Sequence, residues 1–419
     1  MRIIWLCHYF APEIGAPQAR LLELSRVFHD DGHSVGVVTC FPNHPTGRLR
    51  PEDGGVWWRR DEIDGIDVHR CWSLVTAGRG FVNTTLGHLS FMLTSIRGLT
   101  RAAVEQRPDV VIVSSPTFFS VVSAWWWCRR HRVPYVFEVR DLWPAIFVDL
   151  GVLRSRALIG LLERLELFLY RRAARVVTVT HSFADDIAAR GIPREKLGVI
   201  TNAVDVERFK PGERDEQMAH QHALQGRFVV LYLGAHGISQ ALSCLLDVAE
   251  QLSDLDDIRL VFVGEGAERE KLVRSAAERG LSNVSFHAGV PKDEVSRWYD
   301  LADIGLVPLR DVELFKAFIP SKMFELMASG IPIVASVRGE AREILEASGG
   351  AHVVDPEDAV AMARQIRELH ADPALSARFA TSGRAFVERQ YTRRQLGHAY
   401  LDILEETIQD EAHGAARGG

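Results

Sequence analysis

Short, uniformly apolar runs alternate with helical patterns along most of this chain. Strands of a parallel sheet are covered on both faces, so they are apolar throughout rather than at every second position. Runs of this kind that alternate with helices predict an α/β fold with doubly wound parallel sheets. The predicted strands are Arg2–Cys7, Val35–Cys40, Val110–Ser114, Tyr135–Val139, Val176–Thr180, Phe228–Leu233, Leu260–Val263, Val284–His287, Ile304–Val307 and Pro332–Ala335.

One polar stretch, which includes Pro211 and Gly212, interrupts this rhythm near the middle of the chain. A length of 419 residues suits two domains rather than one core. We therefore expect two Rossmann-like domains that face an interdomain cleft. The expected parts are a first domain at 1–203, a linker at 204–226, a second domain at 227–390, a helix at 391–412 that packs back on the first domain, and a frayed tail at 413–419.

Composition narrows the class of protein. Hydrophobic residues make up 47% and charged residues 25%, which is typical of a soluble globular protein. A net charge of -6 does not favour nucleic-acid binding. The chain has five scattered cysteines without C-x-x-C spacing, no apolar run long enough to span a bilayer and no signal-peptide pattern. A cytoplasmic protein without a metal site is expected.

Two loops in the first half carry candidate chemistry. Gly15 and Ala16 lie between the first strand and a helix, where backbone N–H groups can bind a diphosphate; on spacing alone a plain β–α turn is the favoured interpretation. Glu138, Arg140 and Asp141 surround the end of another strand. Asp141 or Glu138 could accept a proton from an acceptor hydroxyl and Arg140 could hold a phosphate; the alternative is a structural Arg–Asp pair.

The second half carries glycine-rich strand ends and one informative helix start. The residues after two successive strands include Gly234, His236, Gly237, Gly264 and Glu265, which could line a ligand crevice or simply form tight turns.

The segment Pro320–Ser336 predicts a helix that Ser321 caps and Gly330 ends, followed by a strand. Lys322 and the helix start would meet a diphosphate, and Glu325 could bind two ribose hydroxyls. After the next strand, Glu340 opens another helix and is a further candidate for donor binding.

These segments together resemble family 4 of the retaining glycosyltransferases, which have the GT-B fold. The resemblance covers essentially the whole chain. The segments that carry it are Gly32–Val38, Arg107–Val111, Asn202–Phe209, Val263–Gly266, Phe286–Val290 and Pro320–Glu325. Within the family, His8–Glu13, Arg140–Pro144 and Pro320–Glu325 resemble a subgroup that builds bacterial surface polysaccharides, several members of which transfer N-acetyl-fucosamine-type sugars to polyprenyl-diphosphate acceptors.

The resemblance implies a nucleotide-sugar donor, with UDP as the expected nucleotide, and transfer with retention and without an essential metal or other cofactor. It places Glu325 on the donor ribose and Val290 beside the base. This chain departs from the family pattern at Ala317, Ala235 and Gln240, where a glutamate, an arginine and a lysine are usual. Lys322, assisted by Arg140 or His236, could supply the missing positive charge.

The sequence leaves two alternative functions open, and it also leaves open whether one surface contacts a membrane. The departures are compatible with a non-catalytic nucleotide-sugar-binding protein, and the two-domain architecture also occurs in nucleotide-sugar 2-epimerases, although the motifs do not match one. The tryptophans Trp125–Trp127 beside Arg129, Arg130 and Arg132, together with Phe81–Ile96, would suit peripheral contact with the inner membrane surface; a core helix with a basic end is the other interpretation.

Overall fold

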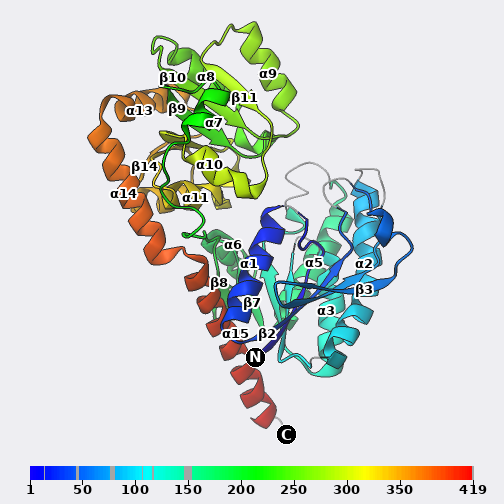
Figure 1. The fold of residues 1–419 in the computed structure, drawn as a ribbon. Helices are drawn as coiled ribbons and strands as arrows, with labels where there is room; N and C mark the ends of the chain where they lie inside the picture. Colours follow the sequence, from blue (N-terminus) through cyan, green and yellow to red (C-terminus); the bar gives the residue numbers. More distant parts are fainter. Residues whose placement is uncertain are drawn as a thin grey trace. The chain divides into compact units, whose positions relative to one another are not determined.

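The computed structural model describes residues 1–13, 15–43, 47–75, 81–105, 107–115, 118–145 and 153–417 (Figure 1). The chain divides into two compact units. The first unit comprises Met1–Thr201 and Arg393–Gly419, and the second comprises Asn202–Thr392. Each unit has its own sheet and its own buried apolar clusters.

Within its described residues, the first unit contains an eight-stranded sheet in the order β3-β4-β2-β1-β5-β6-β7-β8. Side chains of β1 alternate between two cores, with Ile4 and Leu6 in one and Ile3 and Trp5 in the other, which is why the strand is apolar throughout. Its elements are β1 (Arg2–Leu6), α1 (Ala16–Asp30), β2 (Ser34–Cys40), β3 (Trp58–Ile63), β4 (Ile66–Cys71), α2 (Phe81–Glu105), β5 (Val110–Ser114), α3 (Phe118–His131), β6 (Tyr135–Val139), α5 (Arg156–Arg172), β7 (Arg175–Thr178), α6 (His181–Ala189), β8 (Leu197–Val199) and α15 (Arg393–Arg417).

The hairpin β3–β4 was not among the predicted strands. It is antiparallel and lies at the edge of an otherwise parallel sheet. β3 carries four consecutive charged residues, Arg59–Glu62, instead of an apolar run, and the strand is partly exposed. The turn Asp64–Gly65 has positive φ at both residues, 54° and 75°, and an Asp-Gly pair between two strands is the signal that predicts such a hairpin.

The last helix belongs to the first unit. α15 packs against α1, with Tyr400, Leu401 and Leu404 in the same core as Trp5. Arg393 Nε also lies 2.6 Å from a carboxylate oxygen of Glu23. The helix continues to Arg417, so residues 413–417 of the expected frayed tail are helical, and residues 418–419 lie outside the described part of the chain.

The second unit contains, within residues 202–392, a six-stranded parallel sheet in the order β11-β10-β9-β12-β13-β14. Neighbouring residues of β9 again enter opposite cores, Val229 and Leu231 on one face and Val230 and Tyr232 on the other. Its elements are α7 (Glu216–Gln221), β9 (Phe228–Leu233), η3 (Ile238–Gln240), α8 (Ser243–Gln251), β10 (Ile258–Val263), α9 (Arg269–Glu278), β11 (Val284–His287), α10 (Val295–Tyr299), β12 (Ile304–Pro308), η5 (Glu313–Ala317), α11 (Lys322–Ala328), β13 (Ile333–Ser336), α12 (Glu340–Ser348), β14 (Ala351–Val354), α13 (Ala359–Ala371) and α14 (Pro373–Gln390).

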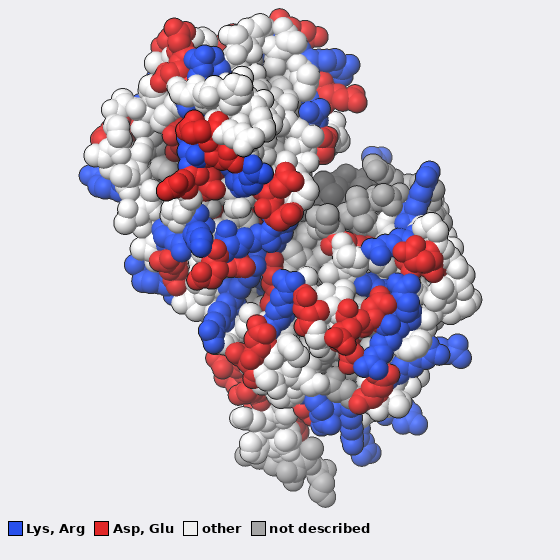
Figure 2. All heavy atoms as spheres, in the orientation of Figure 1, with Lys and Arg blue, Asp and Glu red and all other residues white. Residues whose placement is uncertain are grey.

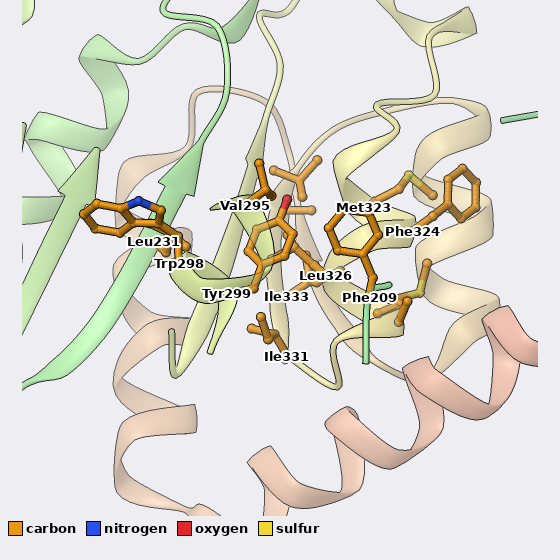
Figure 3. Close-up of a cluster of buried hydrophobic side chains, with 14 of the residues drawn as sticks. Phe209, Leu231, Val295, Trp298, Tyr299, Met323, Phe324, Leu326, Ile331 and Ile333 are labelled. Carbon is orange, nitrogen blue, oxygen red and sulfur yellow. The ribbon is translucent and has the colours of Figure 1, made fainter. Parts of the chain in front are cut away.

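Residues 204–226, which were expected to form a linker, are part of the second unit. They contain α7, and Phe209, Met218 and Leu224 are buried in the core that also holds Tyr299 and Met323 (Figure 3). The polar composition of this stretch hides these few anchoring side chains, so its sequence looks like a linker. Among the described residues, no helix is both long and apolar enough to cross a membrane.

Candidate functional site

The strand order locates the candidate site of the second unit. From β9 the chain first builds the sheet outward through β10 and β11, then returns to the other side of β9 with β12 and continues through β13 and β14. In open α/β sheets, ligands bind beyond the carboxyl ends of the strands at such a reversal. The loops after β9 and β10 begin at Gly234 and Gly264, so the predicted glycines follow neighbouring strands at this edge.

The glycines allow these two loops to touch. The N–H of His236 donates to the carbonyl oxygen of Glu265 at 2.8 Å. A Cβ added to Gly264 would lie 1.9 Å from the carbonyl oxygen of Gly234, and one added to Gly266 would lie 2.4 Å from that of His236. Any larger residue at either position would push the loops apart. Close packing of the two loop backbones therefore explains Gly264 and Gly266. We call these two touching loops, after β9 and β10, the floor of the site.

His236 lies in this floor with a fully buried side chain. Both ring nitrogens lack a hydrogen-bond partner among the described residues. Burial, together with the nearby positive charges of Arg269 and Lys322, lowers the pKa of His236 to about 4. The ring is therefore neutral at pH 7 and cannot replace a missing positive charge.

Lys322, at the start of α11, brings its ammonium to the same loop. Its Nζ lies 3.9 Å from the centroid of the Tyr232 ring, and a Cβ on Gly234 would approach that Nζ to 2.6 Å. The side chain is partly exposed and makes no ion pair within the described part of the chain. Burial lowers the pKa of Lys322 to about 7, and the charge of Glu325 opposes this shift. An unpaired, desolvated ammonium above a glycine loop is suited to bind an anion.

Glu325 lies three residues further along α11, and therefore about one turn away from Lys322. The hydroxyl of the buried Tyr299 donates a hydrogen bond of 2.9 Å to its Oε2. The Tyr299 ring is anchored in the apolar cluster of the second unit (Figure 3). This contact fixes the direction of the carboxylate, which is partly exposed. Tyr299 was not predicted, because its role depends on a contact between α10 and α11 that the sequence does not reveal.

The prediction for Ser321 is wrong in one respect. Ser321 occupies the position before α11, but its side chain makes no capping hydrogen bond. Its backbone is already helical, with φ -58° and ψ -29°, whereas a capping serine normally has an extended backbone.

Two further candidates, Val290 and Glu340, lie on neighbouring segments. Val290 follows β11 and is partly buried against the core, and the N–H of the preceding Gly289 points to Glu265 Oε1 at 3.4 Å. Glu340 is the buried first residue of α12. A Cβ on Gly339 would lie 2.0 Å from the carbonyl oxygen of Lys316, so Glu340 begins beside η5, which ends at Ala317.

Arg310 is a site candidate that the sequence analysis missed. It follows β12, on the other side of the strand reversal, and its N–H donates 2.9 Å to the carbonyl oxygen of Ser239. Its backbone therefore lies next to Gln240, one of the positions where a basic residue was expected. Its side chain is partly exposed and, within the described residues, makes no ion pair. The sequence signal was a basic residue directly after a buried strand.

The first unit has a second polar centre, at the carboxyl ends of β5 and β6. Glu138 is fully buried, and it accepts hydrogen bonds from Arg20 Nε at 3.2 Å and Ser114 Oγ at 2.6 Å. It is therefore a structural residue rather than a free base. The proposed structural pair of Arg140 with Asp141 is absent from the ion pairs of the described residues, and burial raises the pKa of Asp141.

Gly15 precedes α1, and a Cβ there would lie 2.4 Å from Gln18 Oε1. The side chain of Gln18 therefore lies against the loop before α1, and the diphosphate role of Gly15 stays a prediction. Ala16 is the first residue of α1, and the position of its side chain is outside the described part.

Comparisons with known proteins identify the class. A model for the glycosyl transferase 4-like domain matches residues 15–203, and one for glycosyl transferases group 1 matches residues 213–386. Among solved structures, Anabaena Alr3699/HepE in complex with UDP-glucose has a TM-score of 0.71 at 17% identity, and the match covers 97% of this chain and 100% of HepE. For WaaG, a glycosyltransferase involved in lipopolysaccharide biosynthesis, the TM-score is 0.67 at 15% identity, covering 96% and 99% of the two chains. The protein is a glycosyltransferase with the GT-B fold.

Curated relatives agree with this class. The putative colanic acid biosynthesis glycosyl transferase WcaI of Escherichia coli (strain K12) is 24% identical over 420 residues, which cover 98% of this chain and 99% of the relative. The probable glycosyltransferase WbjE of Pseudomonas aeruginosa is 27% identical over 239 residues, 56% of this chain and 59% of the relative. With both domain models matched in order, the chain belongs to family 4 of the glycosyltransferases.

Proposed function

We propose that this glycosyltransferase moves a sugar from a UDP-linked donor to a polyprenyl-diphosphate-linked or other glycan acceptor during the synthesis of a bacterial surface polysaccharide. The name of WcaI, which refers to colanic acid biosynthesis, and the UDP-glucose bound to HepE support the pathway and the nucleotide. The resemblance of Pro320–Glu325 to the surface-polysaccharide subgroup favours an N-acetyl-fucosamine-type sugar.

One observation carries this proposal: the ammonium of Lys322 lies unpaired over the glycine loop after β9. A desolvated cation that forms no ion pair with the protein is costly unless the anion of a ligand binds beside it. Arg310, beside Gln240 on the same edge, adds a second unpaired cation. Together they supply the two positive charges that Ala235 and Gln240 do not provide, and a donor diphosphate is the matching ligand.

The arrangement suggests how the chain accelerates sugar transfer. When the bond between the anomeric carbon and the leaving phosphate oxygen breaks, its electron pair stays with the nucleoside diphosphate. Lys322 and Arg310 stabilise this growing negative charge more than they stabilise the intact donor, which lowers the barrier. Glu325, oriented by Tyr299, binds the two ribose hydroxyls and holds the donor in register. Backbone atoms near Val290 hold the base, and no essential metal is required.

Asp141 is proposed to contact the acceptor hydroxyl. It is partly exposed, it has no ion-pair partner among the described residues, and its raised pKa makes its carboxylate a better proton acceptor. In a reaction that retains the anomeric configuration on the same face, the leaving phosphate takes the hydroxyl proton, and Asp141 then orients the hydroxyl.

A lipid-linked acceptor also requires contact with a membrane surface, for which the first unit offers one face. α3 packs against both α2 and α5. The exposed apolar side chains on these helices include Leu93, which is 65% exposed, Trp126 at 50% and Leu161 at 61%. The exposed basic residues near them are Arg129, Arg130, Arg132, Arg156, Arg164, Arg171 and Arg172.

Only one of the three tryptophans of α3 takes part in this face. Trp127 is buried and stacks on His131, and Trp125 packs edge-on against Phe168. Figure 2 shows one face of the molecule, on which acidic and basic side chains are interspersed. We therefore propose peripheral binding through α2, α3 and α5. Trp126→Ala with Leu161→Ser should reduce sedimentation with vesicles of phosphatidylglycerol and phosphatidylethanolamine; equal sedimentation of wild type and variant would refute this assignment.

The donor site is tested by thermal stabilisation with UDP-, GDP-, dTDP- and CDP-sugars and with the free nucleotides. We expect one nucleotide class to stabilise the wild type and Glu325→Ala to lose this effect. Glu278→Ala, which changes an exposed glutamate in α9, is the matched control and should behave like the wild type. If no nucleotide stabilises the wild type, the proposed donor site is wrong. Donor binding without turnover would instead favour a non-catalytic protein. Epimerisation of the donor sugar in the absence of an acceptor would favour an epimerase.

A further inference from the structure

Two arginines of the first unit, Arg20 and Arg140, lie near a single fully buried carboxylate, that of Glu138, at the carboxyl ends of the strands. Arg20 is fully used: besides Glu138, it donates to the carbonyl oxygens of Thr201 at 2.5 Å and Ile200 at 2.7 Å. Glu138 in turn is occupied by Arg20 and Ser114. The Glu138 carboxylate therefore pairs with Arg20 and not with Arg140.

Arg140 shows the consequence directly. Its Nε and Nη1 atoms are buried and have no hydrogen-bond partner, and no ion pair involves it among the described residues. Its backbone is fixed, because its N–H donates 2.8 Å to Ser115 Oγ in the loop after β5. The residue as a whole is partly exposed. N–H donors of an arginine that have no partner in the protein can donate to phosphate oxygen atoms.

The position of Arg140 also fits a ligand site. In the first unit the strand order reverses between the neighbouring strands β1 and β5: β2 lies on one side of β1, and β5 and β6 lie on the other. Arg140 follows β6, the neighbour of β5. Gln18, in the first turn of α1 after β1, has a buried Oε1 without a partner, and His8, two residues after β1, has a buried Nδ1 without one. Burial lowers the pKa of His8 well below its ordinary value, so the ring is neutral. The edge thus combines one unpaired cation with neutral polar groups.

From this we infer a second anion site, centred on Arg140 in the first unit, that binds a phosphate of the acceptor's diphosphate carrier. The inference rests on the proposed function, because it assumes a polyprenyl-diphosphate-linked acceptor. It goes beyond that proposal by assigning the carrier diphosphate a contact separate from Lys322, which meets the donor diphosphate. The neighbouring Asp141 then lies one residue from the carrier contact, where it can orient the acceptor sugar.

The test uses farnesyl diphosphate as a soluble probe, titrated calorimetrically into the full-length protein that has been saturated with UDP. Arg140→Met should weaken binding of this probe at least about tenfold and leave the affinity for UDP unchanged. Asp141→Asn should bind the probe as well as the wild type or better, because it removes a nearby negative charge. If Arg140→Met weakens UDP instead of the probe, the phosphate belongs to the donor and the inference is wrong. If it weakens neither, Arg140 is no anion site.

Thermal unfolding of the ligand-free variants separates a ligand contact from a structural role. Because Arg140 is unpaired, Arg140→Met should leave the melting temperature unchanged or raise it. Arg20→Met, which removes a fully bonded buried arginine, should lower it clearly and is the matched control. A large loss of stability in Arg140→Met would contradict the inference. Failure of the wild type to bind any nucleotide would instead refute the proposed donor site, and the probe titration can then be run without UDP.

Discussion

The titration of Lys322 makes the affinity for the donor depend on pH in a defined way. In the ligand-free protein, burial lowers the pKa of Lys322 to about 7. A bound diphosphate pairs with the ammonium and raises this pKa, so the donor binds the protonated form in preference. Raising the pH through 7 therefore removes a proton that binding must restore, and the dissociation constant must increase.

The magnitude follows from the size of the shift. Above pH 7, Kd should rise roughly tenfold for each pH unit, which makes binding about 100-fold weaker at pH 9 than on the acidic plateau, ~2.7 kcal/mol. Neighbouring groups do not obscure this window: the pKa values of His236 and His287 are lowered to about 4, and burial raises that of Tyr232 above its ordinary value.

Isothermal titration with the intact nucleotide sugar is the appropriate assay, because its diphosphate carries no group that titrates between pH 6 and 9. Lys322→Arg should bind with a Kd that is flat over this range, since a guanidinium stays charged. Lys322→Met should bind weakly at every pH. Lys271→Met, an exposed lysine in α9, should reproduce the wild-type curve. A flat wild-type curve, or a break that survives in Lys322→Arg, would refute the reasoning.

Three further substitutions test the remaining contacts. Tyr299→Phe removes the hydrogen bond to Glu325 and should weaken donor binding by about 1 kcal/mol, roughly fivefold; an unchanged titration would show that Glu325 needs no orientation. Gly264→Ala should destabilise the protein by at least ~2 kcal/mol in urea unfolding, whereas Gly280→Ala, which has open space at a φ of +65°, should cost only about 1 kcal/mol; equal losses would argue against the close loop contact. Arg310→Gln should weaken donor binding about tenfold at low salt, and the difference from the wild type should be smaller at high salt. If salt weakens donor binding equally in the wild type and in Arg310→Gln, Arg310 makes no phosphate contact.

Much of the fold follows from the hydrophobic pattern, because buried parallel strands need apolar residues on both faces. The predicted strands over β1, β5, β6, β9 and β10 are present. The pattern failed where a strand lies at an edge and is half exposed, as in β3, and where a strand is very short, as in β8 (Leu197–Val199). It also hid the second-unit core residues of 204–226 within a polar stretch.

The site was predictable where a residue follows a strand directly, and not where it depends on contacts between elements. Lys322 and Gly234 are distant in sequence, yet the structure brings the ammonium over the loop. Whether Arg140 pairs with Asp141 could not be decided from their adjacency, because successive side chains diverge and each partner must be found elsewhere in the fold. The neutral state of His236 likewise depends on burial that only the packed structure reveals.

The most direct test of the account is sugar transfer itself, measured by mass spectrometry with a short-chain polyprenyl-diphosphate-linked acceptor and the nucleotide sugar that gives thermal stabilisation. The account predicts a product heavier by one sugar, released with one equivalent of nucleoside diphosphate, and a rate at least about 100-fold lower in Lys322→Met. Tight donor binding without any product, or an undiminished rate in Lys322→Met, would contradict it.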